Sequence, residues 1–312
     1  MTERTLCVGE ALVDVVLRAG AEPTEHVGGS LFNVACGLAS LGAPPSILSW
    51  WGRDVRGHRI AETAARAGVE VVAGSDGAAN TPLAYAHVDA EGRATYEFDL
   101  TWEVPPVGSL EQYGHLHTGS FAATLAPGAD GVRDVVARIR DHATVSYDPN
   151  IRPALMGTPG EVLPRVTEMI AQSDVVKASD EDVAWLYPDE PVDDVMRRWA
   201  ASGPALVVLT RGPDGASVLF DGEMRSVAPR AVDVADTVGA GDSFMAGLVS
   251  GLLDAGYLGS RRAAERLQAA RWSDVEPALH RAVSTSSLTV SGAGAYAPSM
   301  YVVRAAQDPT LR

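Results

Sequence analysis

The residues of this chain that could do chemistry are concentrated in one short segment, 236–244, which reads DTVGAGDSF. Two glycines, Gly239 and Gly241, flank Ala240; Asp242 follows at once, and an apolar pattern at helical spacing then begins. Glycine lets the backbone approach a ligand closely, and the amides at the start of a helix attract an anion. An aspartate at this point can accept a hydroxyl proton while charge builds on a phosphoryl group. The segment therefore predicts phosphoryl transfer to an alcohol.

Two other well-known phosphate-binding sequences do not occur in the chain. A Walker A loop would need Gly-Lys followed by Ser or Thr, and the chain contains no such run. A dinucleotide fingerprint would need a GxGxxG pattern after the first strand, which residues 9–12, GEAL, do not supply. Taken alone, residues 236–244 also fit an ordinary loop with a helix N-cap, because aspartate is a favoured cap.

Composition limits the class of protein further. Hydrophobic residues make up 46% of the 312 positions, which favours a sizeable core over disorder. A net charge of −15 argues against nucleic acid or an anionic membrane as a partner. The two cysteines, Cys7 and Cys36, are typical of small buried residues in a reducing compartment. With a polar N-terminus and no apolar run of about 18 residues, the expectation is a soluble cytoplasmic protein.

Strand and helix patterns alternate along most of the chain, which predicts a mainly parallel sheet covered on both faces. The predicted strands are 6–9, 11–16, 46–52, 115–119, 144–148, 174–178 and 205–210. The predicted helices are 32–41, 59–67, 128–142, 162–172, 180–186, 244–253 and 282–290. Hairpins are predicted at 215–227 and at 83–98, the latter with its turn at 89–92. The second hairpin interrupts the alternation, so we expect it in a small sheet beside the main body.

Three separated segments, in order along the chain, resemble the ribokinase-like (PfkB) family of carbohydrate kinases. Residues 236–243 resemble its C-terminal signature, residues 28–35 (GGSLFNVA) its GGxxxNxA helix start, and residues 52–57 (GRDVRG) its GxDxxG turn. The similarity covers nearly the whole chain. It implies an α/β fold, a ribokinase-like three-layer α/β/α with a mainly parallel central sheet and a small β-sheet lid. We expect a single domain over 1–312, with a lid formed from about 12–28 and 82–100.

The resemblance also implies roles for single residues at the sugar end of the site. Asp242 would be the base that activates the sugar hydroxyl, and Gly239, Ala240 and Gly241 would form the anion hole. Sugar hydroxyls would be bound by residues of the first third of the chain: Asp14, Gly28, Gly29 and Asn33, with Asp54 near them. The pair Gly28-Gly29 would be the hinge on which the lid closes. Taken singly, Asp14, Asn33 and Asp54 also fit ordinary turn and helix-start positions.

Further segments resemble the parts of the family that face the nucleotide. Residues 148–152, DPNIR, resemble the strand end that faces the phosphates, which makes Asn150 and Arg152 candidates, although a plain turn also fits. Lys177, the only lysine, precedes Ser179 and Asp182, which stand where relatives often carry Asn and Glu. Asp182 is a candidate for Mg²⁺ through water, although Ser179 with Asp182 also fits a helix-capping pair.

The adenine side is predicted from two later segments. Residues 210–215 resemble the family's nucleotide-binding turn, with Thr210, Gly212 and Gly215 as candidates, although ordinary turn chemistry also explains the glycines. Residues 284–295 resemble the helix and loop beside the adenine, with Ser284 as a candidate. Its Gly-Ala-Gly run lacks the basic residue of many relatives, which leaves open a monovalent-cation site that would use Asp236.

The substrate is predicted less sharply than the reaction. Residues 9–14, GEALVD, and the serine-containing segment after Lys177 are similar to fructokinases. We therefore expect ATP-dependent phosphorylation of a small unphosphorylated sugar, fructose first, with ATP and Mg²⁺ and with K⁺ as an open question. The alternatives are a 2-keto-3-deoxygluconate kinase, a ribokinase or a nucleoside kinase. A non-catalytic sugar- or nucleotide-binding regulator is the alternative of another class. A homodimer through the lid also stays open.

Overall fold

Two separate β-sheets organise the chain. The structure, a computed structural model, describes residues 4–43, 45–89 and 94–307. In these residues the larger sheet has nine strands, in the spatial order β13 (Glu223–Val227), β12 (Ala216–Phe220), β11 (Leu206–Thr210), β10 (Val175–Ser179), β9 (Thr144–Asp148), β8 (Tyr113–Gly119), β1 (Arg4–Val8), β4 (Pro45–Leu48) and β5 (Glu70–Val71). From β11 to β5 all neighbours are parallel, and β12 and β13 add an antiparallel edge.

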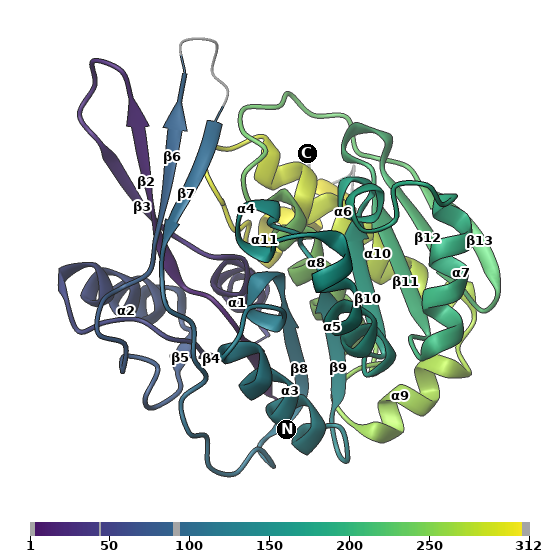
Figure 1. Cartoon of the computed structure of the whole chain (residues 1–312). Coiled ribbons are helices and arrows are strands. Elements are labelled where there is room, and N and C mark those ends of the chain that lie inside the picture. The colour runs from purple at the N-terminus through teal and green to yellow at the C-terminus, as the bar shows by residue number, and fades with distance from the viewer. Residues whose placement is uncertain (1–3, 44, 90–93, 308–312) are drawn as a thin grey trace.

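The smaller sheet projects from one end of the main body (Figure 1). Its order is β3 (Thr24–Gly28), β2 (Leu12–Arg18), β6 (Leu83–Val88) and β7 (Ala94–Asp99). The central pair β2–β6 is parallel and the two outer pairs are antiparallel. The predicted hairpin is confirmed as β6 and β7, while most of its predicted turn at 89–92 lies outside the described residues. These four strands, called the lid below, lie within residues 12–28 and 83–99.

Helices cover both faces of the larger sheet. They are α1 (Ser30–Ser40), α2 (Val55–Ala67), α3 (Gly128–Ile139), α4 (Pro153–Met156), α5 (Pro159–Ala171), α6 (Asp180–Leu186), α7 (Val192–Ser202), α8 (Ala240–Asp254), α9 (Arg261–Gln268), α10 (Trp272–Val290) and α11 (Met300–Gln307). Strand β1 shows how the faces divide: Leu6 and Val8 pack with α3, α5, α6 and α7, whereas Cys7 packs with α1, α8 and α10. The three-layer α/β/α arrangement is therefore confirmed.

Several elements differ from the sequence prediction, each for a physical reason. Helix α10 begins at Trp272, ten residues before the predicted start at 282, because Asp274 closes a capping box on the Arg271 amide (2.8 Å). Helix α2 begins at Val55 rather than 59, since Asp54 caps it. Strand β3 was not predicted, because its sequence TEHVG is largely polar. Such a sequence is typical of an exposed edge strand. Helices α4, α7, α9 and α11 and the short strand β5 were also missed.

Helix α8 follows the glycine-rich segment and lies at the centre of one face of the larger sheet. It is the most deeply buried of the described helices. Residues 242–252 of it are all buried. Two glycines one turn apart allow α10 to approach: a Cβ at Gly247 would lie 2.7 Å from Thr285 Oγ1, and one at Gly251 would lie 2.7 Å from Ala278 Cα. The small residues of α8 thus fix the depth at which the start of the helix, with Asp242, is held. Within the described residues, no helix combines the length and the apolar character that crossing a membrane would need.

This close contact makes Gly251 sensitive to a single added methyl group. We expect Gly251→Ala to lower the free energy of unfolding by about 1–3 kcal/mol, because backbone atoms of α10 would have to shift. Gly160→Ala is the matched control, since a Cβ there meets no atom within 4 Å. It should be neutral or gain about 0.4–1 kcal/mol. Urea unfolding of both variants measures the difference, and equal midpoints would contradict the packing argument.

Candidate active site

Asp242 lies in the first turn of α8, with 8% of its surface exposed. The N-cap of this helix is Gly239, whose φ of 75° is left-handed and favours glycine. The first amides of an α-helix have no partner inside the helix, so those of Gly241 and Asp242 are suited to an anion. The amide of Ala240 already donates to Thr237 O at 3.3 Å. The start of α8 therefore places an amide cluster and a carboxylate side by side.

The Asp242 carboxylate receives hydrogen bonds from the start of another helix. Ser30 Oγ donates to Asp242 Oδ1 at 2.7 Å, and Asn33 Nδ2 donates to Asp242 Oδ2 at 2.8 Å. Both donors lie in the first turn of α1, which begins directly after Gly29. The structure thus brings together the predicted residues Asn33 and Asp242, which are 209 positions apart. Ser30 was missed by the sequence analysis, although it occupies the first helical position after the glycine pair.

The glycine pair leading into α1 is required by close contacts. A Cβ at Gly28 would lie 2.3 Å from Asp14 Oδ2, and one at Gly29 would lie 2.6 Å from the carbonyl oxygen of Glu10. Gly29 also has a φ of 107°. At Gly29 the backbone contact and the positive φ require glycine, whereas a side chain at Gly28 would displace the carboxylate of Asp14; the pair packs directly on β2 and on the residues between β1 and β2. The predicted residues Asp14, Gly28 and Gly29 are therefore neighbours at the base of the lid.

Two buried carboxyl groups border this cluster. Burial raises the pKa of Glu10 to about 7 and that of Asp14 to about 6, the positive charge of Arg152 opposing the rise in both. Glu10 Oε1 accepts the Ser30 amide at 3.3 Å. Its Oε2 is buried and makes no hydrogen bond with the described residues. Glu10 was also missed, although a single charge within the apolar run LCVGEALV signals a buried carboxyl group.

Asp54 has a different set of partners. Its Oδ1 accepts from the Gly57 amide (2.9 Å) and from Thr81 Oγ1 (2.7 Å), and its Oδ2 accepts from the Thr81 amide (2.9 Å). Burial raises the pKa of Asp54, but these hydrogen bonds outweigh it and leave the pKa lowered. Asp54 therefore caps α2 and anchors the segment that leads into β6; these bonds do not include the Asp242 cluster.

Lys177 forms a buried ion pair directly under the start of α8. Its Nζ lies 2.8 Å from Asp148 Oδ2, and the two side chains are 4% and 2% exposed. Burial raises the pKa of Asp148 to about 6 against the opposing charge of Lys177. Burial lowers the pKa of Lys177, but the charge and hydrogen bond of Asp148, together with the charges of Asp182 and Asp242, outweigh burial and leave the pKa raised. A Cβ at Gly241 would lie 2.8 Å from Nζ. A cation therefore lies against the amide cluster of α8.

The segment after β9 connects this ion pair with the Asp242 cluster. Asn150 Nδ2 donates to Ser30 Oγ at 2.8 Å, so this predicted residue points toward the Ser30–Asp242 contact. Asp182 Oδ1 accepts the Ile151 amide at 2.7 Å, and Asp182 Oδ2 accepts from the amide (2.8 Å) and hydroxyl (2.7 Å) of Ser179. Ser179 caps α6. Asp182 and Ser179 thus hold the segment in place, and Arg152 acts electrostatically on Glu10 and Asp14.

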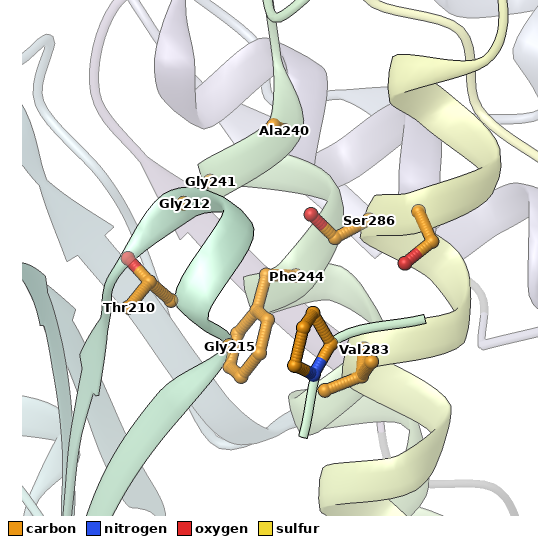
Figure 2. A pocket seen from close by; sticks show the side chains of 10 residues that line it. Thr210, Gly212, Gly215, Ala240, Gly241, Phe244, Val283 and Ser286 are labelled. Carbon is orange, nitrogen blue, oxygen red and sulfur yellow. The ribbon is translucent and has the colours of Figure 1, made fainter. Parts of the chain in front are cut away.

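A groove runs between α8 and α10 on the other side of the amide cluster. It is lined by Thr210, Gly212, Gly215, Pro229, Ala240, Gly241, Phe244, Val283, Ser286 and Ser287. Figure 2 shows Val283 and Ser286 on α10 opposite Phe244 of α8. The predicted Thr210, Gly212 and Gly215 are thereby brought to the edge of Gly241.

One residue predicted for this groove is not among those that line it. Ser284 donates to the carbonyl oxygen of His280 and lines a neighbouring hollow with Arg230 and Glu276. The residues of α10 that line the groove are Val283, Ser286 and Ser287, which the helical period of α10 could have identified.

Asp236 joins two loops beside the groove. Its Oδ1 accepts the Val238 amide at 3.0 Å, and its Oδ2 accepts the Gly294 amide at 2.9 Å. The described residues contain no group of three or more His, Cys, Asp or Glu side chains placed to hold a metal ion. Asp236 therefore connects the glycine-rich segment with the loop after α10.

Comparison with known proteins finds similarity over nearly the whole chain. The model of the pfkB family of carbohydrate kinases matches residues 2–300. A fructokinase of Rhizobium leguminosarum bv. trifolii is 31% identical over 262 residues, covering 79% of each chain. Among solved structures, the fructokinase of Xylella fastidiosa with bound ATP superposes with a TM-score of 0.84 at 22% identity, over 98% of both chains.

A second solved structure carries further ligands. The fructokinase of Vibrio cholerae O395, as a double mutant with fructose, ADP and potassium bound, superposes with a TM-score of 0.79 at 24% identity. It covers 98% of this chain and 99% of that one. At these identities the two structures establish the ribokinase-like fold.

The buried carboxyl group of Glu10 gives stability a defined pH dependence. The pKa of Glu10 is higher in the folded chain than in the unfolded chain. At pH values between these two pKa values the folded chain binds more protons than the unfolded chain, so the free energy of unfolding falls as pH rises. Glu10→Gln removes this cost, so its stability advantage over the parent should grow by about 2 kcal/mol from about pH 5.5 to about pH 8.

Urea unfolding at the two pH values measures this advantage. Glu22→Gln, which changes an exposed glutamate, is the control and should show no such growth. An advantage for Glu10→Gln that is the same at both pH values would contradict the burial argument.

Proposed function

Because the chain belongs to the pfkB family of carbohydrate kinases, we propose that it transfers the γ-phosphoryl group of ATP to a hydroxyl of a small unphosphorylated sugar, fructose first. As a member of this family it is a phosphotransferase with an alcohol group as acceptor. The observation that carries the finer proposal is the start of α8, where Asp242 stands beside free helix amides and Lys177.

In this proposal Asp242 is the base. Its carboxylate is held by Ser30 and Asn33 at the junction of the sugar side and the groove between α8 and α10. The helix dipole favours its ionised form, which suits a proton acceptor. Gly239 sets the turn, and the amides of Ala240, Gly241 and Asp242 form the anion hole for the transferring phosphoryl group. For Ala240 this requires its amide to exchange the long bond to Thr237 for the phosphoryl oxygen.

The charges around the lid support an uncharged sugar. The arginines of α2 and its approach are all held in ion pairs: Arg53 with Asp76 at 2.8 Å, and Arg56 and Arg59 with the single carboxylate of Glu25 at 2.5 Å each. A phosphosugar would need unpaired basic groups there, whereas Asp14, Asn33 and the Gly28–Gly29 backbone offer hydrogen bonds to hydroxyls. Fructose is the first candidate acceptor because several relatives of this chain are fructokinases.

A second candidate follows from Arg152. Its guanidinium acts electrostatically on Glu10 and Asp14 at the sugar side. An arginine in that place could pair with a sugar carboxylate, which favours 2-keto-3-deoxygluconate as the second substrate.

ATP is proposed for the groove between α8 and α10. Thr210, Gly212 and Gly215 border it on one side and α10 on the other, so a flat base would lie between them with its phosphates toward Gly241 and Lys177. A compact cation such as Lys177 suits a phosphate as a point charge. In this proposal Ser284 lies behind the groove and does not line the ATP site.

Mg²⁺ would accompany ATP as part of the substrate. Two observations fit a hydrated ion: Asp148 Oδ1 is buried and makes no hydrogen bond with the described residues, and Asp182 Oδ1 has one lone pair left beside the Ile151 bond. When bound, Mg²⁺ neutralises charge on the phosphates. A monovalent cation such as K⁺ near Asp236 is proposed by analogy with the potassium-bound Vibrio relative.

The remaining parts of the proposal concern the whole molecule. The lid over 12–28 and 82–100 belongs with the rest of 1–312 to one domain, because its residues pack with both cores: Tyr85 with one and Phe98 with the other. Tyr96, which is 54% exposed and stacked on Phe98, is an exposed aromatic residue of the lid at which a homodimer could form. A cytoplasmic location is part of the same proposal.

The reaction is tested by ADP release with Mg-ATP and a panel of acceptors: fructose, ribose, 2-keto-3-deoxygluconate, adenosine and fructose 6-phosphate. One acceptor, fructose by our proposal, should exceed the others in kcat/KM by about tenfold or more. Asp242→Asn should lower kcat by about two to four orders of magnitude while ATP still binds, because the proton acceptor is removed.

Two outcomes of this assay would count against the proposal. Near-normal turnover by Asp242→Asn would exclude Asp242 as the base. Sugar binding without ADP release from any acceptor would instead favour the non-catalytic regulator.

Closing of the lid is tested by hydrogen exchange. Saturating sugar should slow exchange of the amides in β6 and β7, because a lid closed over the substrate exposes its backbone less often. Helix α5, which packs on the opposite face of the main sheet from α8, is the internal control and should not change. Equal exchange of β6 and β7 with and without sugar would show that the sheet is not a closing lid.

A further inference from the structure

Ser30 is held in the site by three hydrogen bonds, each to a different element. Its amide donates to Glu10 Oε1 at 3.3 Å, its hydroxyl donates to Asp242 Oδ1 at 2.7 Å, and the hydroxyl oxygen accepts from Asn150 Nδ2 at 2.8 Å. The residue is 7% exposed. Its side chain therefore lies between the proposed base and the segment after β9.

The direction of these hydrogen bonds follows from the number of protons available. An ionised carboxylate only accepts, so the single hydroxyl proton of Ser30 must point at Asp242. The Ser30 oxygen is then left as an acceptor, and Asn150 must present its amide N–H rather than its carbonyl oxygen. Asn150 thus donates to Ser30, and Ser30 donates to Asp242, so the hydrogen bonds form a chain that ends on the carboxylate. Hydrogen bonds in such a chain strengthen one another.

The first member of this chain is itself fixed. Asn150 has a φ of 39°, in the left-handed region that asparagine tolerates better than most residues. The next amide, that of Ile151, is held by Asp182 at 2.7 Å, and Asp182 is held by Ser179. Two residues earlier, Asp148 is paired with Lys177. The orientation of the Asn150 side chain is therefore set by the same segment that carries the ion pair under α8.

We propose that Ser30 and Asn150 are positioning residues for the reaction, forming a hydrogen-bonded relay that orients the Asp242 carboxylate and couples it to the segment 148–152. This inference rests on the proposed role of Asp242 as the base. With Ser30 on Oδ1 and Asn33 on Oδ2, the carboxylate plane is fixed. Each oxygen of the Asp242 carboxylate keeps a second lone pair, so a lone pair remains to accept the proton of the sugar hydroxyl.

The kinetic test compares variants on the best acceptor of the panel at saturating Mg-ATP. Ser30→Ala should lower kcat by about tenfold, the worth of one charge-assisted hydrogen bond, with less than about a twofold change in KM for the sugar. The acidic limb of its pH–rate profile should move to higher pH, because the carboxylate loses a donor that favours its ionised form. In the Asp242→Asn background, Ser30→Ala should cost nothing further.

Two further variants separate the relay from a general loss of packing. Asn150→Asp keeps a residue that tolerates the left-handed backbone but replaces the donor by an acceptor, so the Ser30 proton turns away from Asp242 and kcat should fall as in Ser30→Ala. Ser40→Ala is the matched control: Ser40 ends the same helix, donates to Ala297 O at 3.1 Å and lies far along α1 from the base. It should keep the parental kcat and pH profile.

A second readout needs no turnover. In urea unfolding, the double variant Ser30→Ala/Asp242→Ala should lose less stability than the two single changes Ser30→Ala and Asp242→Ala together, because each of them removes the same hydrogen bond. Additive losses would overturn the relay whatever the activity of the protein. So would a parental kcat and pH profile in Ser30→Ala when Asp242→Asn is inactive. An active Asp242→Asn would instead show that the proposed base is wrong, and the catalytic role of the relay would fall with it.

Discussion

The hydrogen bonds that Asp242 receives from Ser30 and Asn33 join the starts of two helices, and the site depends on that junction. Helix α1 follows the glycine pair at the base of the lid, and α8 follows the glycine-rich segment beside the groove. One carboxylate therefore connects the half of the site that faces the lid with the half that faces the groove. The close approach of α8 to α10 through Gly247 and Gly251 fixes the depth of that carboxylate in the molecule.

The topology explains why so many functional side chains meet at one edge. Glu10, Asp148, Ser179 and Thr210 stand at or just after the carboxyl ends of β1, β9, β10 and β11, which run parallel in the larger sheet. In open α/β sheets ligands bind at this edge, because the loops there can vary without disturbing the strands. The lid arises from the same edge, since β2 follows β1 directly and β3 leads into α1.

Burial of charge gives the site its electrostatic character. Glu10, Asp14 and Asp148 have raised pKa values because burial disfavours their ionised forms, and Lys177 and Arg152 provide the compensating positive charge. The arginines near the lid are instead held in ion pairs with Glu25 and Asp76. Lys177 lies against Gly241 at the start of α8. In the proposed reaction, these charges suit a neutral acceptor and an anionic donor.

The sequence by itself determined the alternation of strands and helices, the lid hairpin, the family and the segment that starts α8. These are local properties: hydrophobic period, turn residues and short motifs are contained within a few consecutive positions. The polar strand β3 and the capped start of α10 were not predicted, because no hydrophobic period marks them: β3 is held by pairing with β2, and a local capping box begins α10. Only the tertiary structure decided that Asp54 caps α2, that Asn150 faces Ser30, and that Ser284 lies behind the groove. Such assignments depend on the direction of a side chain toward residues far away in the chain, and no local pattern contains that direction.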